Sequence, residues 1–104
     1  MNLGQAIAEV RQRKCIKQKV LARRCQISQT YLSQIENNRR DPNLSTLKKI
    51  SQVLEVPLPI IFFLSLTDED IPEQKKEAFG YLSSSVKAFV QEFFSDSLQS
   101  GSPT

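Results

Sequence analysis

A run of hydroxyl and amide side chains is the part of this sequence best suited to specific recognition chemistry. Five of these side chains share one side of a helical pattern: Ser28, Gln29, Thr30, Ser33 and Gln34. A glutamine amide can form two hydrogen bonds with adenine, at N6 and N7, and a Ser or Thr hydroxyl can bond several base edges. A helix with such an outward face fits the major groove of B-DNA. A merely solvated face would carry Glu and Lys instead, so the run predicts contact with base pairs.

Two helices that pack across a short turn must hold these side chains in place. Residues 18–37 fit this arrangement, because the positions that would face inward are small or apolar: Ala22, Ile27, Leu32 and Ile35. Ser28 is a favourable N-cap for the second helix of the pair. Asn37 and Asn38 tolerate left-handed backbone better than most residues and mark the end of that helix.

The rest of the chain also shows helical spacing, which predicts an all-α fold. A first helix covers residues 3–14, a short apolar helix covers residues 60–64 after two prolines, and a long helix covers residues 72–98. Between them, Asn43 or Ser45 caps a further helix. The apolar face of that helix consists of Leu44, Leu47, Ile50, Val53 and Leu54. No stretch alternates with period two for long enough to indicate a strand.

A wider set of positions in the first three-fifths of the chain forms one further pattern. Its members are Leu3, Ile7, Arg11, Gln18, Leu21, Ala22, Ile27, Ser28, the run 31–37, Pro42, Leu47, Ile50, Leu54 and Val56. With these residues the chain resembles the phage-repressor/Cro (Xre-type) helix-turn-helix family from Leu3 to about Leu64. The resemblance implies a five-helix, lambda-repressor-like DNA-binding domain whose third helix lies in the major groove. It also implies regulation of transcription, usually by dimers on inverted-repeat operators.

The resemblance assigns roles to individual residues. The base readers fall on Gln29, Thr30, Ser33 and Gln34. The contacts with the DNA backbone fall on Gln18, Ser28, Tyr31, Asn37, Asn38, Arg39 and Arg40. Arg11 and Glu36 take the positions of a structural ion pair between the first helix and the end of the third. For Tyr31, packing beside the second helix is as good an interpretation as contact between its hydroxyl and a phosphate.

Three positions where the family usually has glycine carry other residues in this chain, namely Cys15, Gln26 and Asn38. Left-handed backbone at the first two would cost about 1 kcal/mol each. Asn38 suits such a conformation well. We interpret these replacements as variation within the family, because the apolar spacing around them is intact, and the exact geometry of the turns stays open.

The two halves of the chain have opposite charge. Residues 1–56 carry eleven Lys or Arg against four Asp or Glu, and residues 57–104 carry three against seven. The net charges of +7 and −4 indicate a polyanion-binding first part and a tail with another task. We expect four segments: a DNA-binding domain at 1–66, an acidic linker at 67–71, an amphipathic helix at 72–98 and a disordered tail at 99–104.

The amphipathic helix has an apolar seam with three-four spacing. It consists of Phe79, Leu82, Val86, Phe89 and Phe93, and it is widened by Val90 and Phe94. Burial of each large apolar side chain is worth about 1.5–3 kcal/mol, so the seam favours a covering partner. We expect homodimerisation, which would place two recognition helices on two half-sites of double-stranded DNA. Two alternatives stay open: the helix covers its own domain, or it binds another protein, as in an antitoxin or an antagonist-controlled switch.

Composition excludes several other function classes. The chain has no histidine, which excludes a Cys/His zinc site and histidine-based general-base catalysis. It has no Gly-rich phosphate loop, and Asp68, Glu69 and Asp70 lack the spacing of a calcium loop. We expect no metal, no cofactor and no enzymatic activity. The apolar stretch at 56–66 is too short to span a membrane and we see no secretory signal, so we expect a cytoplasmic location, where both cysteines stay free thiols.

Overall fold

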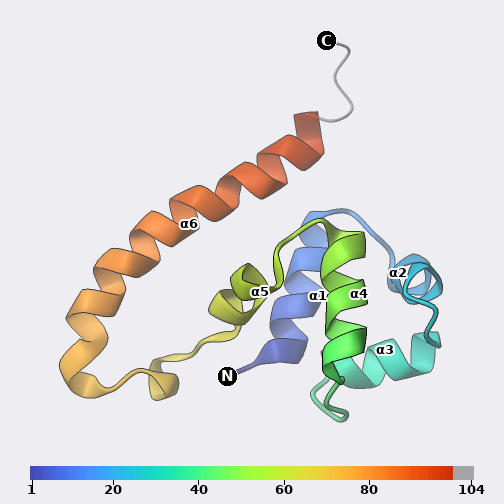
Figure 1. The fold of residues 1–104 in the computed structure, drawn as a ribbon, viewed down its shortest axis with the longest axis horizontal. Coiled ribbons are helices and arrows are strands. Elements are labelled where there is room, and N and C mark those ends of the chain that lie inside the picture. Colours follow the sequence, from blue (N-terminus) through green and yellow to red (C-terminus); the bar gives the residue numbers. More distant parts are fainter. Residues whose placement is uncertain (100–104) are drawn as a thin grey trace. The chain divides into compact units, whose positions relative to one another are not determined.

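α-Helices make up nearly all of the regular structure in residues 1–99, the part of the chain that the computed structural model describes (Figure 1). Side chains are described for residues 1–94. Over residues 1–99 the chain forms six α-helices, two short 3₁₀ turns and no strand, which confirms the all-α prediction. The tail expected at 99–104 lies outside the described residues, apart from Gln99 at the end of the last helix. The chain divides into two units, Met1–Leu66 and Thr67–Thr104.

Five helices form the first unit: α1 (Leu3–Arg13), α2 (Gln18–Arg24), α3 (Gln29–Glu36), α4 (Leu44–Leu54) and α5 (Leu58–Ser65). α1 packs against α3 and α5, α2 packs against α3 and α4, and α4 also packs against α5. Three of these helices begin with a side-chain cap, from Asn2, Ser28 and Asn43. Asn43 Oδ1 accepts from Thr46 N at 2.8 Å, so Asn43 is the cap of α4 and Ser45 is not.

Apolar side chains from all five helices close the core of the first unit. Those at most 1% exposed are Ile7, Val10, Leu21, Cys25, Leu32, Ile35, Ile50, Leu54, Val56 and Ile61. The small side chain of Ala22 is also buried, where α2 packs against its neighbours. Leu44 departs from the predicted apolar face, because it is the first residue of α4 and its side chain is 56% exposed there.

Four helices end in left-handed backbone without glycine. Cys15, Gln26, Asn38 and Glu55 have φ angles of 58°, 60°, 58° and 57°. The first three are the glycine replacements, so the backbone at these helix ends stays left-handed without glycine. Glu55 is a position that the sequence did not indicate, because a glutamate side chain does not favour this region of backbone space.

The first turn of α1 lies directly against the last turn of α3. Gly4 is the point of closest approach, since a Cβ there would clash with Ile35 O and would lie 2.8 Å from Glu36 O. Asn38 Oδ1 accepts from Gly4 N at 3.1 Å, and Asn38 Nδ2 donates to Asn2 Oδ1 at 2.6 Å. Packing and hydrogen bonds together fix the end of α3 to the start of α1.

The second unit contains two 3₁₀ turns, η1 (Asp68–Asp70) and η2 (Glu73–Lys75), followed by α6 (Lys76–Gln99). Thr67 and Asp70 close η1 with reciprocal capping bonds, one of them from Thr67 N to Asp70 Oδ2 at 2.8 Å. The segment predicted as an acidic linker therefore contains an ordered turn. The α-helix proper begins at Lys76 and not at Pro72 as predicted.

The predicted apolar seam runs along α6. On this helix the rings of Phe89 and Phe93 meet edge to face, with centroids 5.3 Å apart. Tyr81, Leu82 and Phe89 are exposed. Among the described residues, no helix is long and apolar enough to cross a membrane.

Candidate nucleic-acid interface

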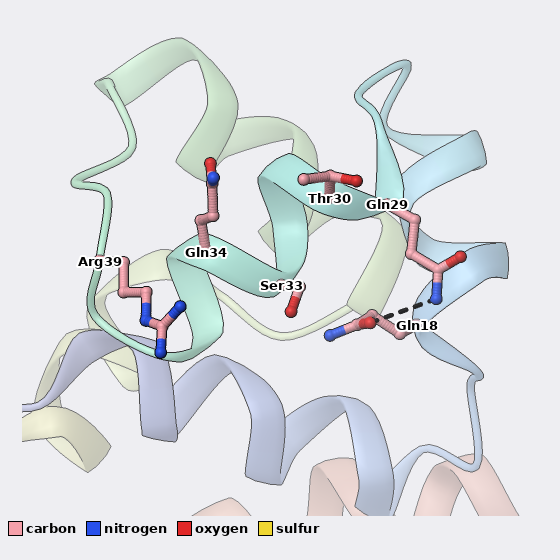
Figure 2. Close-up of a pocket in the computed structure, with 6 residues that line it drawn as sticks. All are labelled: Gln18, Gln29, Thr30, Ser33, Gln34 and Arg39. Atoms are coloured by element: carbon pink, nitrogen blue, oxygen red, sulfur yellow. Dashed lines mark hydrogen bonds between the residues drawn. The ribbon is translucent and has the colours of Figure 1, made fainter.

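Six polar side chains line one concave surface of about 370 Å³ beside α3 (Figure 2). Gln18 comes from the start of α2, Arg39 comes from the loop after α3, and the other four come from α3 itself: Gln29, Thr30, Ser33 and Gln34. Figure 2 shows Gln18 and Gln29 at one end of α3 and Arg39 at the other end. The structure therefore brings all four predicted base readers together with two of the predicted backbone contacts.

A chain of hydrogen bonds connects this surface with a buried ion pair. Arg11 Nε and Nη2 donate to the two carboxylate oxygens of Glu36 at 2.8 and 3.0 Å, and the side chains are 12% and 6% exposed. Gln18 Nε2 donates to Glu36 Oε1 at 3.1 Å. Gln29 Nε2 in turn donates to Gln18 Oε1 at 3.3 Å. Glu36 thus orients Gln18, and Gln18 orients the first residue of α3.

The Gln29 amide keeps hydrogen-bonding capacity that suits a base. Nε2 carries two hydrogens and gives one to Gln18, so a second donor remains beside the acceptor Oε1. One donor and one acceptor on the same amide match N7 and N6 of adenine in the major groove. The hydroxyl of Ser33 and the amide of Gln34 extend the same polar surface along α3.

Besides Gln18, three more of the predicted backbone contacts make hydrogen bonds within the domain. Ser28 Oγ accepts from Tyr31 N at 3.0 Å and caps α3. Asn37 Nδ2 donates to Ser33 O at 2.8 Å. The amide of Asn38 is bonded to the start of α1, as described above. These side chains therefore hold the two ends of α3 in the geometry that presents its outward face.

The two adjacent arginines after α3 lie in different surroundings. Arg40 Cζ lies 5.1 Å from the centre of the Tyr31 ring, a cation–π contact, and Tyr31 is half-buried. Arg39 instead lines the concave surface with the predicted base readers. The sequence interpretation assigned one role to both residues, because the course of the turn after α3 decides where each side chain points.

The first unit has two features that are typical of a DNA-binding helix-turn-helix: the paired helices α2 and α3, and the polar outward face of α3. A helix-turn-helix family model matches residues 7–61, just over half of the chain. The chain belongs to the phage-repressor (Xre-type) helix-turn-helix family. The family is one of DNA-binding regulators of transcription, and residues 7–61 form its helix-turn-helix domain in this chain.

Two similar proteins come from Bacillus phage phi105. The chain is 34% identical to its immunity repressor protein over 61 residues, which cover 59% of this chain and 42% of that one. It is 35% identical to the ImmF control region 10 kDa protein over 72 residues, or 69% of this chain and 77% of that one. The match thus spans less than half of the immunity repressor.

A solved structure supports the fold. The clp gene regulator ClgR of Corynebacterium glutamicum superimposes with a TM-score of 0.61 at 19% identity. The match covers 99% of this chain and 93% of ClgR. This similarity confirms the lambda-repressor-like all-α fold.

Proposed function

We propose that this protein is a cytoplasmic repressor that binds an operator as a homodimer and reads each half-site with α3 in the major groove. The observation that carries the proposal is the shared concave surface of Gln29, Thr30, Ser33 and Gln34. Four side chains able to bond base edges face one side of a short helix whose other side is buried through Leu32 and Ile35. That arrangement matches the way helix-turn-helix proteins present a recognition helix.

Charge supports the same proposal. The first unit carries a net charge of +7, which favours association with the phosphates of DNA whatever the sequence. Glu36 is the only charged residue of α3, and its side chain is nearly buried and paired with Arg11, so the outward face of α3 carries no formal charge. Affinity thus comes mainly from the surrounding cations, whereas sequence preference comes from the neutral side chains of α3.

Selection of binding sites from random DNA tests the recognition surface. We expect the full chain to enrich one inverted repeat, and Gln29→Ala or Gln34→Ala to relax preference at one position per half-site. Each lost contact should cost about 1–3 kcal/mol of discrimination. Gln52→Ala serves as the matched control, because Gln52 is an exposed glutamine on α4, away from the concave surface. If both α3 variants enriched the same consensus as the unchanged chain, α3 would not be the reader.

The proposed dimer rests on the composition of the second unit. In its described residues α6 is the one α-helix, and Leu82 and Phe89 of the seam are exposed, whereas Val90 and Phe94 beside it are buried. The seam repeats with three-four spacing over Phe79, Leu82, Val86, Phe89 and Phe93, as in helices that pair side by side. Ser83 and Ser85 flank its middle and are small and uncharged, so two identical helices can approach there without repulsion.

Sedimentation of the full chain tests the dimer. Phe89→Asp places a charge in the seam and should make the protein monomeric, with operator affinity reduced on the order of tenfold or more because each half-site then binds alone. Gln91→Asp adds the same charge at an exposed position outside the seam and should leave the dimer intact. A chain that is monomeric before any change would contradict the proposal and point to the alternatives, a seam that covers its own domain or that binds a protein antagonist.

A further inference from the structure

Arg39 and Arg40 are chemically identical neighbours, yet only one of them lies on the concave surface. We propose that Arg39 reads a guanine in each half-site, whereas Arg40 contributes only general attraction to the DNA backbone. This inference rests on the proposed function, since it assumes that the concave surface faces the major groove. Arg39 would then be a specificity-determining residue. The sequence alone does not distinguish its role from that of Arg40.

The backbone of Arg39 is fixed to the recognition helix. Arg39 N donates to Gln34 O at 2.8 Å, so the residue belongs to the cap of α3. The preceding Asn38 has a φ of 58°, and its side chain is bonded to Gly4 and Asn2 of the first helix region. The left-handed residue reverses the chain at this point. The Arg39 side chain therefore starts from a defined place beside Ser33 and Gln34 (Figure 2).

The surroundings of Arg40 are different. Its guanidinium lies over the ring of Tyr31 at 5.1 Å, which holds it beside α3 and away from the group of base readers. A cation in this position can still attract phosphates, because the stacked ring leaves its charge unchanged. The pair thus offers a comparison in which residue type and charge are equal and only placement differs.

Guanine is the base that fits an arginine on such a surface. It presents two acceptors in the major groove, O6 and N7, and the planar guanidinium presents donors in a matching fork. The amides of α3 donate from a single nitrogen and its hydroxyls carry one hydrogen each, so neither matches this two-nitrogen fork. Arg39 and Gln29 also lie at opposite ends of α3. Eight helical residues extend about 12 Å, and base pairs are stacked about 3.4 Å apart, so Arg39 should read a base pair about three steps from the one that Gln29 reads.

Random-site selection with the full chain and two variants tests this inference. Arg39→Ala should lose a guanine preference at one position per half-site, and binding to the selected operator should weaken about 5- to 150-fold. Arg40→Ala removes the same charge but should enrich the unchanged consensus, with binding weakened to a similar extent on every sequence and a shallower salt dependence. Equal thermal unfolding of the three proteins checks that neither change disturbs the domain.

A second measurement changes the DNA and compares the unchanged protein with the Arg39→Ala protein. Replacement of the guanine by 7-deazaguanine removes the N7 acceptor and leaves the DNA backbone intact. The unchanged protein should bind this operator several-fold more weakly, and the Arg39→Ala protein should bind both operators equally. The inference is overturned if Arg39→Ala keeps the full consensus, or if both proteins respond alike to 7-deazaguanine. Should the unchanged protein enrich no sequence at all, the proposed function itself fails, and the two failures can be told apart.

Discussion

At the scale of single residues, Glu36 has two tasks at once. One carboxylate oxygen accepts from both Arg11 and Gln18, and the other accepts from Arg11 alone. The same side chain therefore neutralises a buried cation and orients the amide of Gln18 beside Gln29, the first of the proposed base readers. Substitution of Glu36 should therefore affect both the stability of the domain and, on the proposed function, its choice of DNA sequence.

Loss of one partner of the Arg11–Glu36 pair should destabilise the first unit strongly. Both side chains are nearly buried, and an unpaired charge left there costs about 3–5 kcal/mol. We expect a drop of this size in the free energy of unfolding for Arg11→Ala and for Glu36→Ala, measured by urea denaturation. The double variant should lose less than the sum of the two, because it leaves no charge unpaired. Additive losses would show that the pair is not coupled.

The sequence predicts which residues of α3 share the concave surface. The types and spacing of Gln29, Ser33 and Gln34 point to the outward face of α3 because helical periodicity alone decides which side faces out. The same reasoning cannot separate Arg39 from Arg40. Their directions depend on the left-handed turn at Asn38 and on the ring of Tyr31, and both are tertiary features.

At the scale of elements, the helix ends are the least regular part of the first unit. Cys15, Gln26 and Glu55 adopt a conformation that L residues other than Asn and Asp avoid. Each lies one or two residues after the end of a helix, where the chain must turn back toward the core. The fold keeps this geometry because buried residues on both sides, such as Leu54 and Val56 around Glu55, leave the chain no other course.

Glycine at these helix ends should stabilise the domain. Cys15→Gly and Gln26→Gly should each raise the free energy of unfolding by about 1 kcal/mol, because glycine adopts left-handed backbone without steric penalty. A gain of that size corresponds to roughly 4–8 °C in the melting temperature of a small domain. Thermal unfolding followed by circular dichroism measures it.

Asn38→Gly provides the contrast to those two changes. Left-handed backbone costs Asn38 less free energy than it costs Cys15 or Gln26. The Asn38 side-chain amide is also hydrogen-bonded to Gly4 N and Asn2 Oδ1. We expect no gain in stability or a small loss for this variant. A rise in melting temperature equal to that of Cys15→Gly would mean that the Asn38 hydrogen bonds contribute nothing.

The ends of a helix could be predicted where the local residues determine them. They differ from the prediction where tertiary packing determines them. Ser28 caps α3 as its residue type suggests. α5, in contrast, begins at Leu58 and accommodates Pro59 within its first turn, two residues before the predicted start. Proline is tolerated there because the N–H that it lacks would have no partner in the helix. Neither the sequence of α4 nor that of α5 reveals the left-handed link at Glu55 between them.

At the scale of the whole molecule, the accessibility of the two cysteines shows whether the core of the first unit is closed to solvent. Cys15 is exposed and Cys25 is 1% exposed. Burial raises the pKa of the Cys25 thiol above its usual value, and the nearby charge of Lys49 lowers it in part. The thiol of Cys25 is therefore both shielded and protonated in the folded protein at neutral pH.

Labelling with a thiol reagent should distinguish the two sites. We expect Cys15 to react at once and Cys25 to react only as fast as the domain opens, so that the second rate follows unfolding in urea. A protein in which both thiols react together in native buffer would lack the closed core.

The raised pKa of Cys25 also predicts a dependence of stability on pH. The contribution of the thiol to stability is complete below its usual pKa, where folded and unfolded chains both hold the proton. It is lost as pH rises past that value, because the unfolded chain ionises first. Cys25→Ala should remove this part of the decline in unfolding free energy toward alkaline pH, whereas Cys15→Ala should leave it in place.

The division of α3 into a buried face and a polar face has a consequence for how such regulators diverge. Leu32 and Ile35 hold the helix in the domain, and the neighbouring outward residues contribute little to the core. On the proposed role of α3, substitutions among the outward residues can therefore redirect the protein to a new operator while the scaffold stays folded. After gene duplication, a few substitutions on this face can give the two copies different operators within one cell. Neither copy has to pass through an unfolded intermediate sequence.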